Sequence, residues 1–282
     1  MHGLIYRSLI AIAFFELAIA CQSPAAAEEL VRFAGAVASA PRVEGIRNNT
    51  SLPKTEPEVQ GYLTKPKGDG PFPAVVLLHS CLGLRIDRRS IAERLASWGY
   101  VGLIVDDFTT RRIRETCTVD FPEGLSDAFG ALAFIATLPY VDKTRIGVVG
   151  YSQGADTALQ IATLRFRSAV AMPKDVAFKA AAAFYPPCEN QLSSHTRLRL
   201  PTLILIGAAD AVTPAAACQR FVSRQSGADV QLVVYPGASH VFDDPEFSGG
   251  KRFLGMWLQF DERAAAQSWS ALRDFLATKL AQ

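Results

Sequence analysis

The sequence predicts an α/β fold, in which helices cover both faces of a mostly parallel central sheet. One observation is that short apolar runs typical of buried strands alternate with segments of helical pattern after about residue 60. Another is size, because 282 residues with 49% hydrophobic content can bury a large core, and one α/β domain commonly takes this length. The third is that no internal repeat or low-complexity linker divides the sequence.

Each expected element has a simple reason in the sequence. Strands are predicted where Val, Ile and Leu form short runs, at residues 73–78, 103–105, 145–149, 203–207 and 230–235. Helices are predicted from helical patterns at residues 86–97, 123–137, 152–164, 214–225 and 264–280. The chain between Ser152 and Asp210 must hold one helix and two strands, so we expect no large lid domain and an open cleft.

The segment 150–154 reads Gly-Tyr-Ser-Gln-Gly and lies between a predicted strand and a predicted helix. A G-x-S-x-G sequence in this context is typical of a nucleophile elbow, a strained turn that lifts a serine hydroxyl above the sheet edge. Glycines flank the serine because a Cβ at either place would crowd the adjoining strand or helix. An ordinary turn with a serine N-cap would look the same, so the interpretation of Ser152 as a nucleophile depends on its partners.

Two candidate partners follow Ser152 along the chain. Asp210 lies just after the predicted strand 203–207, and His240 lies in the loop after the predicted strand 230–235. This order of Ser, Asp and His, each after a strand, is the order found in α/β-hydrolases. An imidazole must take the proton of the serine, and a buried carboxylate must orient the imidazole. We therefore predict an α/β-hydrolase fold with Ser152, Asp210 and His240 as catalytic residues.

The loop at residues 79–84, His-Ser-Cys-Leu-Gly-Leu, predicts part of an oxyanion hole. In α/β-hydrolases one backbone N–H comes from this loop and another from the residue after the nucleophile. We assign these two amides to Cys81 and Gln153. His79 is expected to be structural and to orient the loop.

The chain resembles the dienelactone hydrolase family of α/β-hydrolases from about residue 60 to its C-terminus. The segments that carry the resemblance are 61–63, 71–79, 98–101, 147–152, 183–187, 207–210 and 235–242. The serine, acid and histidine motifs are specific to the superfamily, and the last segment, Tyr-Pro-Gly-Ala-Ser-His-Val-Phe, is more specific to this family. The resemblance implies an enzyme that hydrolyses a small-molecule carboxylic ester or lactone, with no cofactor.

Three positions depart from the type enzyme of that family. Ser152 stands where that enzyme has a cysteine, Ser80 where it has a glutamate, and Asp244 where it has an arginine that binds a substrate carboxylate. Each difference argues against a dianionic dienelactone as substrate. A neutral ester or lactone, cleaved through an acyl-enzyme, is the predicted substrate class.

Two alternatives to this function stay open. A peptidase could use the same triad, since only the pocket distinguishes the two activities. A hydrolase fold without catalytic activity could serve in binding. The presence of all three triad residues argues against this, because a site that has lost its activity need not keep them. A net charge of +2 without a basic cluster argues against a nucleic-acid partner. No metal site is expected, and the one basic run, residues 111–114, is interpreted as a solvated loop.

Residues 1–27 are predicted to be a signal peptide. The apolar run 9–20 is too short to span a bilayer, and residues 25–27, Ala-Ala-Ala, offer a cleavage site. Residues 28–59 are then an N-terminal lead-in with one edge strand, and residues 60–282 form the hydrolase domain. We expect a periplasmic or secreted protein without a stable membrane span. Cleavage before Cys21 would instead give a lipoprotein.

Four cysteines remain after the signal peptide is removed: Cys81, Cys117, Cys188 and Cys218. They allow three pairings, and the sequence alone does not choose among them. The fold implied by the resemblance suggests one, because Cys81 and Cys117 then follow two neighbouring strands, and Cys188 and Cys218 another two. We therefore predict disulfides Cys81–Cys117 and Cys188–Cys218, which fit an oxidising compartment.

Overall fold

The computed structural model describes residues 28–36, 58–85, 89–119, 121, 123–163, 172, 175–192 and 196–281. The helices in this part of the chain are α1 (Ser90–Ser97), α2 (Glu123–Ile135), α3 (Gln153–Ala162), α4 (Ala215–Ser223), α5 (Glu262–Lys279) and the 3₁₀ helices η3 (Cys188–Gln191) and η4 (Pro245–Phe247). The strands are β1 (Glu28–Ala34), β2 (Glu58–Thr64), β3 (Phe72–Leu78), β4 (Val101–Asp106), β5 (Val141–Tyr151), β6 (Phe178–Phe184), β7 (Thr202–Gly207), β8 (Val230–Tyr235), β9 (Lys251–Phe253) and β10 (Met256–Leu258).

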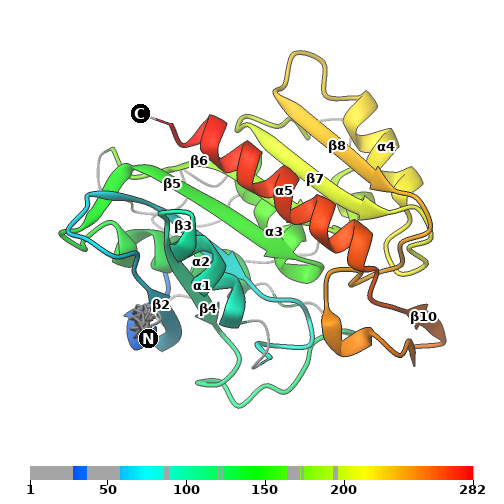
Figure 1. The fold of residues 1–282 in the computed structure, drawn as a ribbon, viewed down its shortest axis with the longest axis horizontal. Helices are drawn as coiled ribbons and strands as arrows, with labels where there is room; N and C mark the ends of the chain where they lie inside the picture. Colours follow the sequence, from blue (N-terminus) through cyan, green and yellow to red (C-terminus); the bar gives the residue numbers. More distant parts are fainter. Residues whose placement is uncertain are drawn as a thin grey trace, which may run out of the picture.

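Strands β1 to β8 form one sheet in the order β1-β2-β4-β3-β5-β6-β7-β8 (Figure 1). β2 pairs antiparallel with both β1 and β4, whereas the strands from β4 to β8 are all parallel. Parallel strands end at the same edge of a sheet, which is where ligands bind in open α/β folds. The loops after β3, β5, β7 and β8 therefore meet at one edge.

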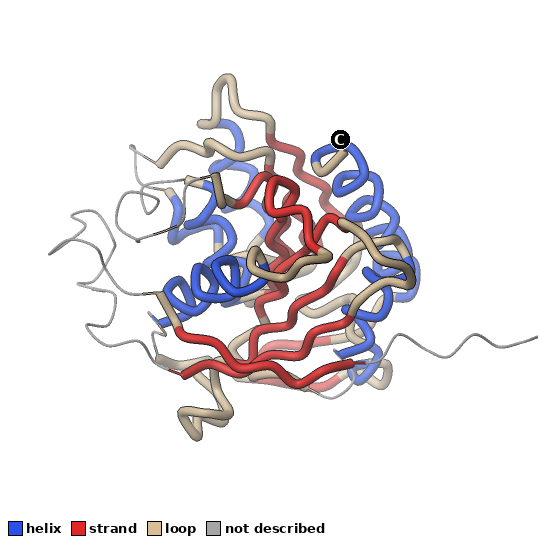
Figure 2. The backbone as a smooth tube through the Cα atoms, turned by 90° about the vertical axis from the view of Figure 1, so that its left-hand side faces the viewer, coloured by secondary structure: helices blue, strands red, loops and turns tan. Residues whose placement is uncertain are grey.

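Helices cover both faces of this sheet (Figure 2). α1 and α5 lie on one face, where the rings of Trp98 and Trp269 meet with centroids 6.2 Å apart. α2, α3 and α4 lie on the other face. Because both faces are covered, every residue of β4 and of β7 is buried, as expected for strands that read as continuous apolar runs.

The predicted fold class is confirmed, and the predicted helices overlap the observed ones closely. The edge strand expected within residues 28–59 is β1, at the end of the main sheet, and β2 begins at Glu58, shortly before the expected start of the domain. The predicted signal peptide, residues 1–27, lies outside the described residues. The domain boundaries remain predictions.

After the predicted histidine loop, β9 and β10 pair as a small antiparallel hairpin. Phe253 and Phe260 of this segment are partly buried against the core. Trp257 on β10 is 47% exposed, and its indole N–H donates to Oε1 of Gln259. The hairpin therefore projects from the body of the domain (Figure 1).

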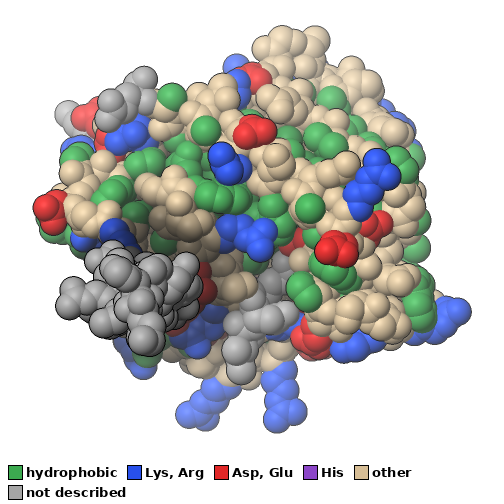
Figure 3. All heavy atoms as spheres, in the orientation of Figure 1, with side chains coloured by type: hydrophobic (Ala, Val, Ile, Leu, Met, Phe, Trp, Pro, Cys, Tyr) green, Lys and Arg blue, Asp and Glu red, His purple; other side chains and the backbone are tan. Residues whose placement is uncertain are grey.

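The described surface is mixed in charge. On the face drawn in Figure 3, acidic and basic side chains are scattered among polar and apolar ones. None of the described helices is long and apolar enough to cross a membrane.

Candidate active site

Ser152 stands in a strained turn between β5 and α3. Its backbone angles are φ 52° and ψ −110°, which non-glycine residues rarely adopt. Glycine is required on both sides of Ser152 because a Cβ would clash with the backbone. A Cβ on Gly150 would lie 2.1 Å from the carbonyl oxygen of Gly154, and a Cβ on Gly154 would lie 2.5 Å from the carbonyl oxygen of His79. The predicted elbow geometry is therefore present, with the serine at the C-terminal end of a central strand.

The three predicted catalytic residues lie together in one chain of hydrogen bonds. Nε2 of His240 is 3.0 Å from Oγ of Ser152, and Nδ1 of His240 is 2.8 Å from Oδ2 of Asp210. All three residues are at least nine-tenths buried. With the proton on Nδ1, the ring can accept the serine proton at Nε2 while Asp210 holds its orientation.

Thr213 helps to hold Asp210, a role that was not predicted from the sequence. The backbone amides of Val212 and Thr213 donate to Oδ1 of Asp210 at 2.9 and 2.8 Å. The Thr213 hydroxyl lies 2.9 Å from the other carboxylate oxygen, Oδ2. Aspartate carboxylates commonly accept hydrogen bonds from the turn that follows them, so the Asp-x-x-Thr spacing could have revealed this role.

Tyr185 supports the histidine from the side. Its ring meets the His240 imidazole edge-on, with centroids 4.6 Å apart, and its hydroxyl donates to Oδ1 of Asp243 at 2.9 Å. Tyr185 is fully buried. It was identified within a family-like segment but not as a neighbour of the site, because the contact joins two loops distant in sequence.

The two residues predicted to form the oxyanion hole are linked through Thr116. The Thr116 amide donates to the carbonyl of Cys81 at 2.9 Å, and the Thr116 hydroxyl donates to Oε1 of Gln153 at 2.8 Å. Gln153 is the first residue of α3, where backbone N–H groups have no acceptor within the helix. The loop after β4 thus contacts both residues.

Both predicted disulfides are present. Cys81 is bonded to Cys117, with Cα atoms 4.8 Å apart, and Cys188 is bonded to Cys218, with Cα atoms 4.9 Å apart. Each bond joins segments that follow neighbouring strands: the loops after β3 and β4, and the helices η3 and α4 after β6 and β7. The first bond braces the loop that carries Cys81.

His79 belongs to a buried polar cluster beneath that loop. Its Nε2 lies 2.7 Å from Oδ1 of Asp107, and its Nδ1 lies 2.7 Å from the carbonyl oxygen of Ser80. Burial alone lowers the pKa of His79, but the Asp107 carboxylate and these hydrogen bonds outweigh it and raise the pKa above its usual value. This agrees with the expected structural role.

Arg111, in contrast, is not the solvated residue that was expected. Its guanidinium pairs with the carboxylate of Asp127 at 2.8 Å and donates to the carbonyl of Asp107 at 2.6 Å. The Asp127 side chain is fully buried. Its burial, followed by the nearby Asp107 carboxylate, raises its pKa to about 7, although Arg111 opposes the shift.

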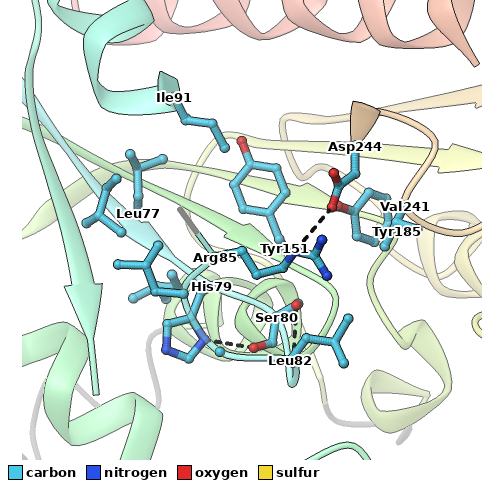
Figure 4. Close-up of a pocket in the computed structure, with 14 residues that line it drawn as sticks. Leu77, His79, Ser80, Leu82, Arg85, Ile91, Tyr151, Tyr185, Val241 and Asp244 are labelled. Carbon is cyan, nitrogen blue, oxygen red and sulfur yellow. Dashed lines mark hydrogen bonds and ion pairs between the residues drawn. The ribbon is translucent and has the colours of Figure 1, made fainter. Parts of the chain in front are cut away.

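A pocket adjoins the candidate site between β3, α1 and the loop after β8 (Figure 4). It holds about 470 Å³ of empty space, with its open mouth included. Most of its lining is apolar, and Tyr151, which precedes Ser152, faces it. At its polar end Nε of Arg85 lies 4.0 Å from Oδ2 of Asp244, and Arg85 also pairs with Glu246. Asp244, which stands where the type enzyme of the family has an arginine, therefore lies beside an arginine from another loop.

Within the described residues, no group of three or more His, Cys, Asp or Glu side chains is placed to hold a metal ion.

The fold, with this serine turn at the end of a central parallel strand, defines the class of protein: an α/β-hydrolase. The model of the dienelactone hydrolase family matches residues 59–280. The chain therefore belongs to the dienelactone hydrolase family and is a carboxylic ester or lactone hydrolase. This membership argues against the alternative of a non-catalytic binding protein.

Three distant relatives are similar to most of the chain. A protein of Synechocystis sp., assigned as a carboxymethylenebutenolidase, is 22% identical over 258 residues, which span 82% of this chain and 96% of that protein. A dienelactone hydrolase-like promiscuous phosphotriesterase from metagenomic libraries has a TM-score of 0.66 at 18% identity, covering 90% of this chain and 99% of its own. A thermophilic esterase of Thermogutta terrifontis, solved with propionate, has a TM-score of 0.59 at 18% identity, covering 88% and 95%. These structures are similar in fold.

Proposed function

We propose that this protein is a serine hydrolase that cleaves a neutral carboxylic ester or lactone through an acyl-enzyme at Ser152. The observation that carries the proposal is the buried chain of hydrogen bonds from Ser152 through His240 to Asp210. A serine hydroxyl is a weak nucleophile at neutral pH and needs a base within hydrogen-bond reach. His240 meets that condition in the structure.

In the acylation step, His240 takes the proton of Ser152 as the serine oxygen attacks the substrate carbonyl. The negative oxygen of the tetrahedral intermediate then needs donors that are already in place. The backbone amides of Cys81 and Gln153 supply them in this proposal. The imidazolium gives its proton to the leaving alkoxide, which departs as an alcohol and leaves Ser152 esterified.

In the deacylation step, His240 takes a proton from water, and the resulting hydroxide attacks the ester carbon. The second intermediate collapses with release of the carboxylic acid, and His240 returns the proton to Ser152. Asp210 stays ionised throughout, since its role is to orient the ring and to stabilise its charged form. The three hydrogen bonds that reach Asp210 from the next turn hold it in that orientation.

The proposed preference for neutral substrates rests on charges around the site. Ser80 and Asp244 replace the glutamate and arginine of the type enzyme. The arginine that does line the neighbouring pocket, Arg85, already faces the carboxylates of Asp244 and Glu246. A substrate carboxylate there would compete with two protein carboxylates.

We also propose that the protein acts in the periplasm or outside the cell. The two disulfides are typical of proteins that fold in an oxidising compartment. The predicted signal peptide at residues 1–27 agrees with export.

The first experiment is hydrolysis of short-chain p-nitrophenyl esters by the wild-type protein and its Ser152→Ala variant. We expect wild-type turnover and a loss of at least about 10⁴-fold in the variant. A fluorophosphonate should label the wild type and not the variant. Ser223→Ala is a matched control, since that hydroxyl bonds only the Arg220 carbonyl of its own helix. Equal activity in wild type and Ser152→Ala would exclude Ser152 as the nucleophile.

A further inference from the structure

The peptide bond between Ser80 and Cys81 carries the proposed oxyanion donor. The carbonyl of Ser80 and the N–H of Cys81 belong to one planar unit, and in a trans peptide they point in opposite directions. This bond is trans in the structure, where the cis bond is Gly70–Pro71. Whatever fixes the direction of the Ser80 carbonyl therefore fixes the direction of the Cys81 amide.

The Ser80 carbonyl is held from the side opposite to that amide. Nδ1 of His79 lies 2.7 Å from the carbonyl oxygen, and the backbone N–H of Gly83 donates to it at 3.0 Å. The Cys81–Cys117 disulfide and the bond from Thr116 act elsewhere, on the Cys81 side chain and on its own carbonyl. Those two constraints leave the preceding peptide free to rotate between its Cα atoms, so the contacts with His79 and Gly83 must hold it.

Both partners of the His79 ring are acceptors. The Ser80 carbonyl can only accept, and an ionised Asp107 carboxylate, 2.7 Å from Nε2, can only accept as well. Nδ1 must donate to the Ser80 carbonyl, because without its proton it would turn a lone pair toward that oxygen. At Nε2 the contact has the distance of an ion pair but not the alignment of a hydrogen bond. An ion pair with an ionised Asp107 requires the second proton, so the ring is then an imidazolium.

The surroundings of the ring favour its charged form. Burial itself opposes the charge, since the side chains of His79 and Asp107 are only 8% and 9% exposed, but the neighbouring carboxylates outweigh it. The rings of Phe108 and His79 meet in a T-shaped contact, with centroids 4.5 Å apart. The charges around it come from Asp106 and Asp107 at the end of β4, with Asp127 of α2 and Arg111 paired behind them. Only the Asp107 carboxylate contacts the ring in the described part of the chain, and Asp106 acts on it through space.

We propose that His79 is a positioning residue: as an imidazolium anchored by Asp107, it keeps the Cys81 amide directed at the substrate carbonyl oxygen. The inference rests on the proposed function, in which that amide binds the oxyanion. A neutral ring has one N–H and can satisfy only one of its two partners. Loss of the proton at alkaline pH would therefore release either the anchor or the Ser80 carbonyl, and activity should fall.

Two variants test the kinetic consequence. Asp107→Asn keeps the size of the anchor but removes its charge, so the ring should lose its proton at lower pH. We expect the alkaline limb of the kcat profile to move down by about one pH unit or more. His79→Gln cannot titrate, so that limb should disappear while kcat falls by about 100-fold with KM little changed, as for loss of one oxyanion donor.

The matched control is Asp106→Asn, a neighbouring carboxylate that bonds Gln60 and the Thr109 amide rather than the ring. Its alkaline limb should move much less than that of Asp107→Asn. Thermal unfolding of each variant shows whether it is folded at the assay temperature. An alkaline limb that stays at the wild-type pH in a folded Asp107→Asn variant would overturn the inference.

A second measurement does not depend on activity. Nitrogen-15 NMR of the full, histidine-labelled protein at neutral pH should show both nitrogens of one buried ring protonated, assigned to His79 by comparison with His79→Gln. A neutral His79 ring would overturn the inference even if Ser152 proves to be the nucleophile. An imidazolium in a protein whose Ser152→Ala variant keeps its activity would overturn the proposed function and leave the charged pair standing.

Discussion

Thr116 donates its side-chain hydroxyl to Oε1 of Gln153 across 2.8 Å and so connects the loop after β4 to the residue that follows Ser152. The same residue donates its amide to the carbonyl of Cys81, and the next residue, Cys117, is bonded to the side chain of Cys81. One short segment therefore braces both halves of the proposed oxyanion hole.

Thr116→Val should lower kcat about tenfold and leave KM nearly unchanged. The substitution keeps the shape of the side chain but removes the hydroxyl that holds Gln153. The Gln153 amide is proposed to stabilise the oxyanion of the transition state, so kcat should fall without an effect on substrate binding. Thr116→Ser keeps the hydroxyl and is the control. Steady-state kinetics on one p-nitrophenyl ester measures both, and a valine variant that is as active as the serine variant would contradict the bracing role.

The two disulfides should differ in their effect on catalysis but not in their effect on stability. They close loops of similar length, with sequence separations of 36 and 30 residues, so removing either should cost about 4 kcal/mol of unfolding free energy. Only the double variant Cys81→Ser/Cys117→Ser should also lose kcat, because its loop carries the proposed donor. Urea unfolding and steady-state kinetics of this variant and of Cys188→Ser/Cys218→Ser measure both effects. Equal kcat values in the two variants would show that the Cys81–Cys117 disulfide is not needed for catalysis.

Asp210→Asn should reduce kcat by about 10⁴-fold while the protein stays folded. The amide is the same size as the carboxylate but does not stabilise the imidazolium of His240, and it can favour the wrong tautomer. Asp142→Asn is the control, since that carboxylate accepts from Thr144 and Arg145 at the end of β5 opposite to Ser152. A loss below about tenfold in Asp210→Asn would mean that another group orients the ring.

Much of this architecture could be predicted because its signals are local. Strands buried on both faces read as continuous apolar runs, and β3, β4 and β7 are of this kind. The positions of Ser152, Asp210 and His240 follow from strand ends, since parallel strands bring their carboxyl ends to one edge. The disulfide pairing, in contrast, required the strand order that the family resemblance implies.

The contacts that could not be predicted join segments through side chains. Arg111 belongs to a basic run that is typical of solvated loops, and nothing in the sequence shows that the buried carboxylate of Asp127 faces it. Trp257 lies among apolar residues that suggest packing, yet the short β9–β10 pairing exposes it. Thr116 is an unremarkable loop residue until the loops after β3 and β4 come together.

Asp127 should make the protein less stable as the pH rises from about 4 to 7. Its pKa is raised from 3.8 to about 7, mainly by burial, so in this range the unfolded chain has lost a proton that the folded protein retains. The folded state then binds more protons, and the unfolding free energy falls with pH. Below about pH 4 the side chain is protonated in both states, and this contribution is fully present.

Asp127→Asn cannot titrate, so its unfolding free energy should fall less between pH 5 and pH 8 than that of the wild type. The two proteins should differ in their loss of unfolding free energy over that interval by on the order of 2 kcal/mol. Urea unfolding at both pH values measures it, and the comparison cancels the other titrating groups, His79 included, because both proteins carry them. Parallel losses of stability in the two proteins would show that Asp127 is already ionised at pH 5, with its pair to Arg111 outweighing its burial.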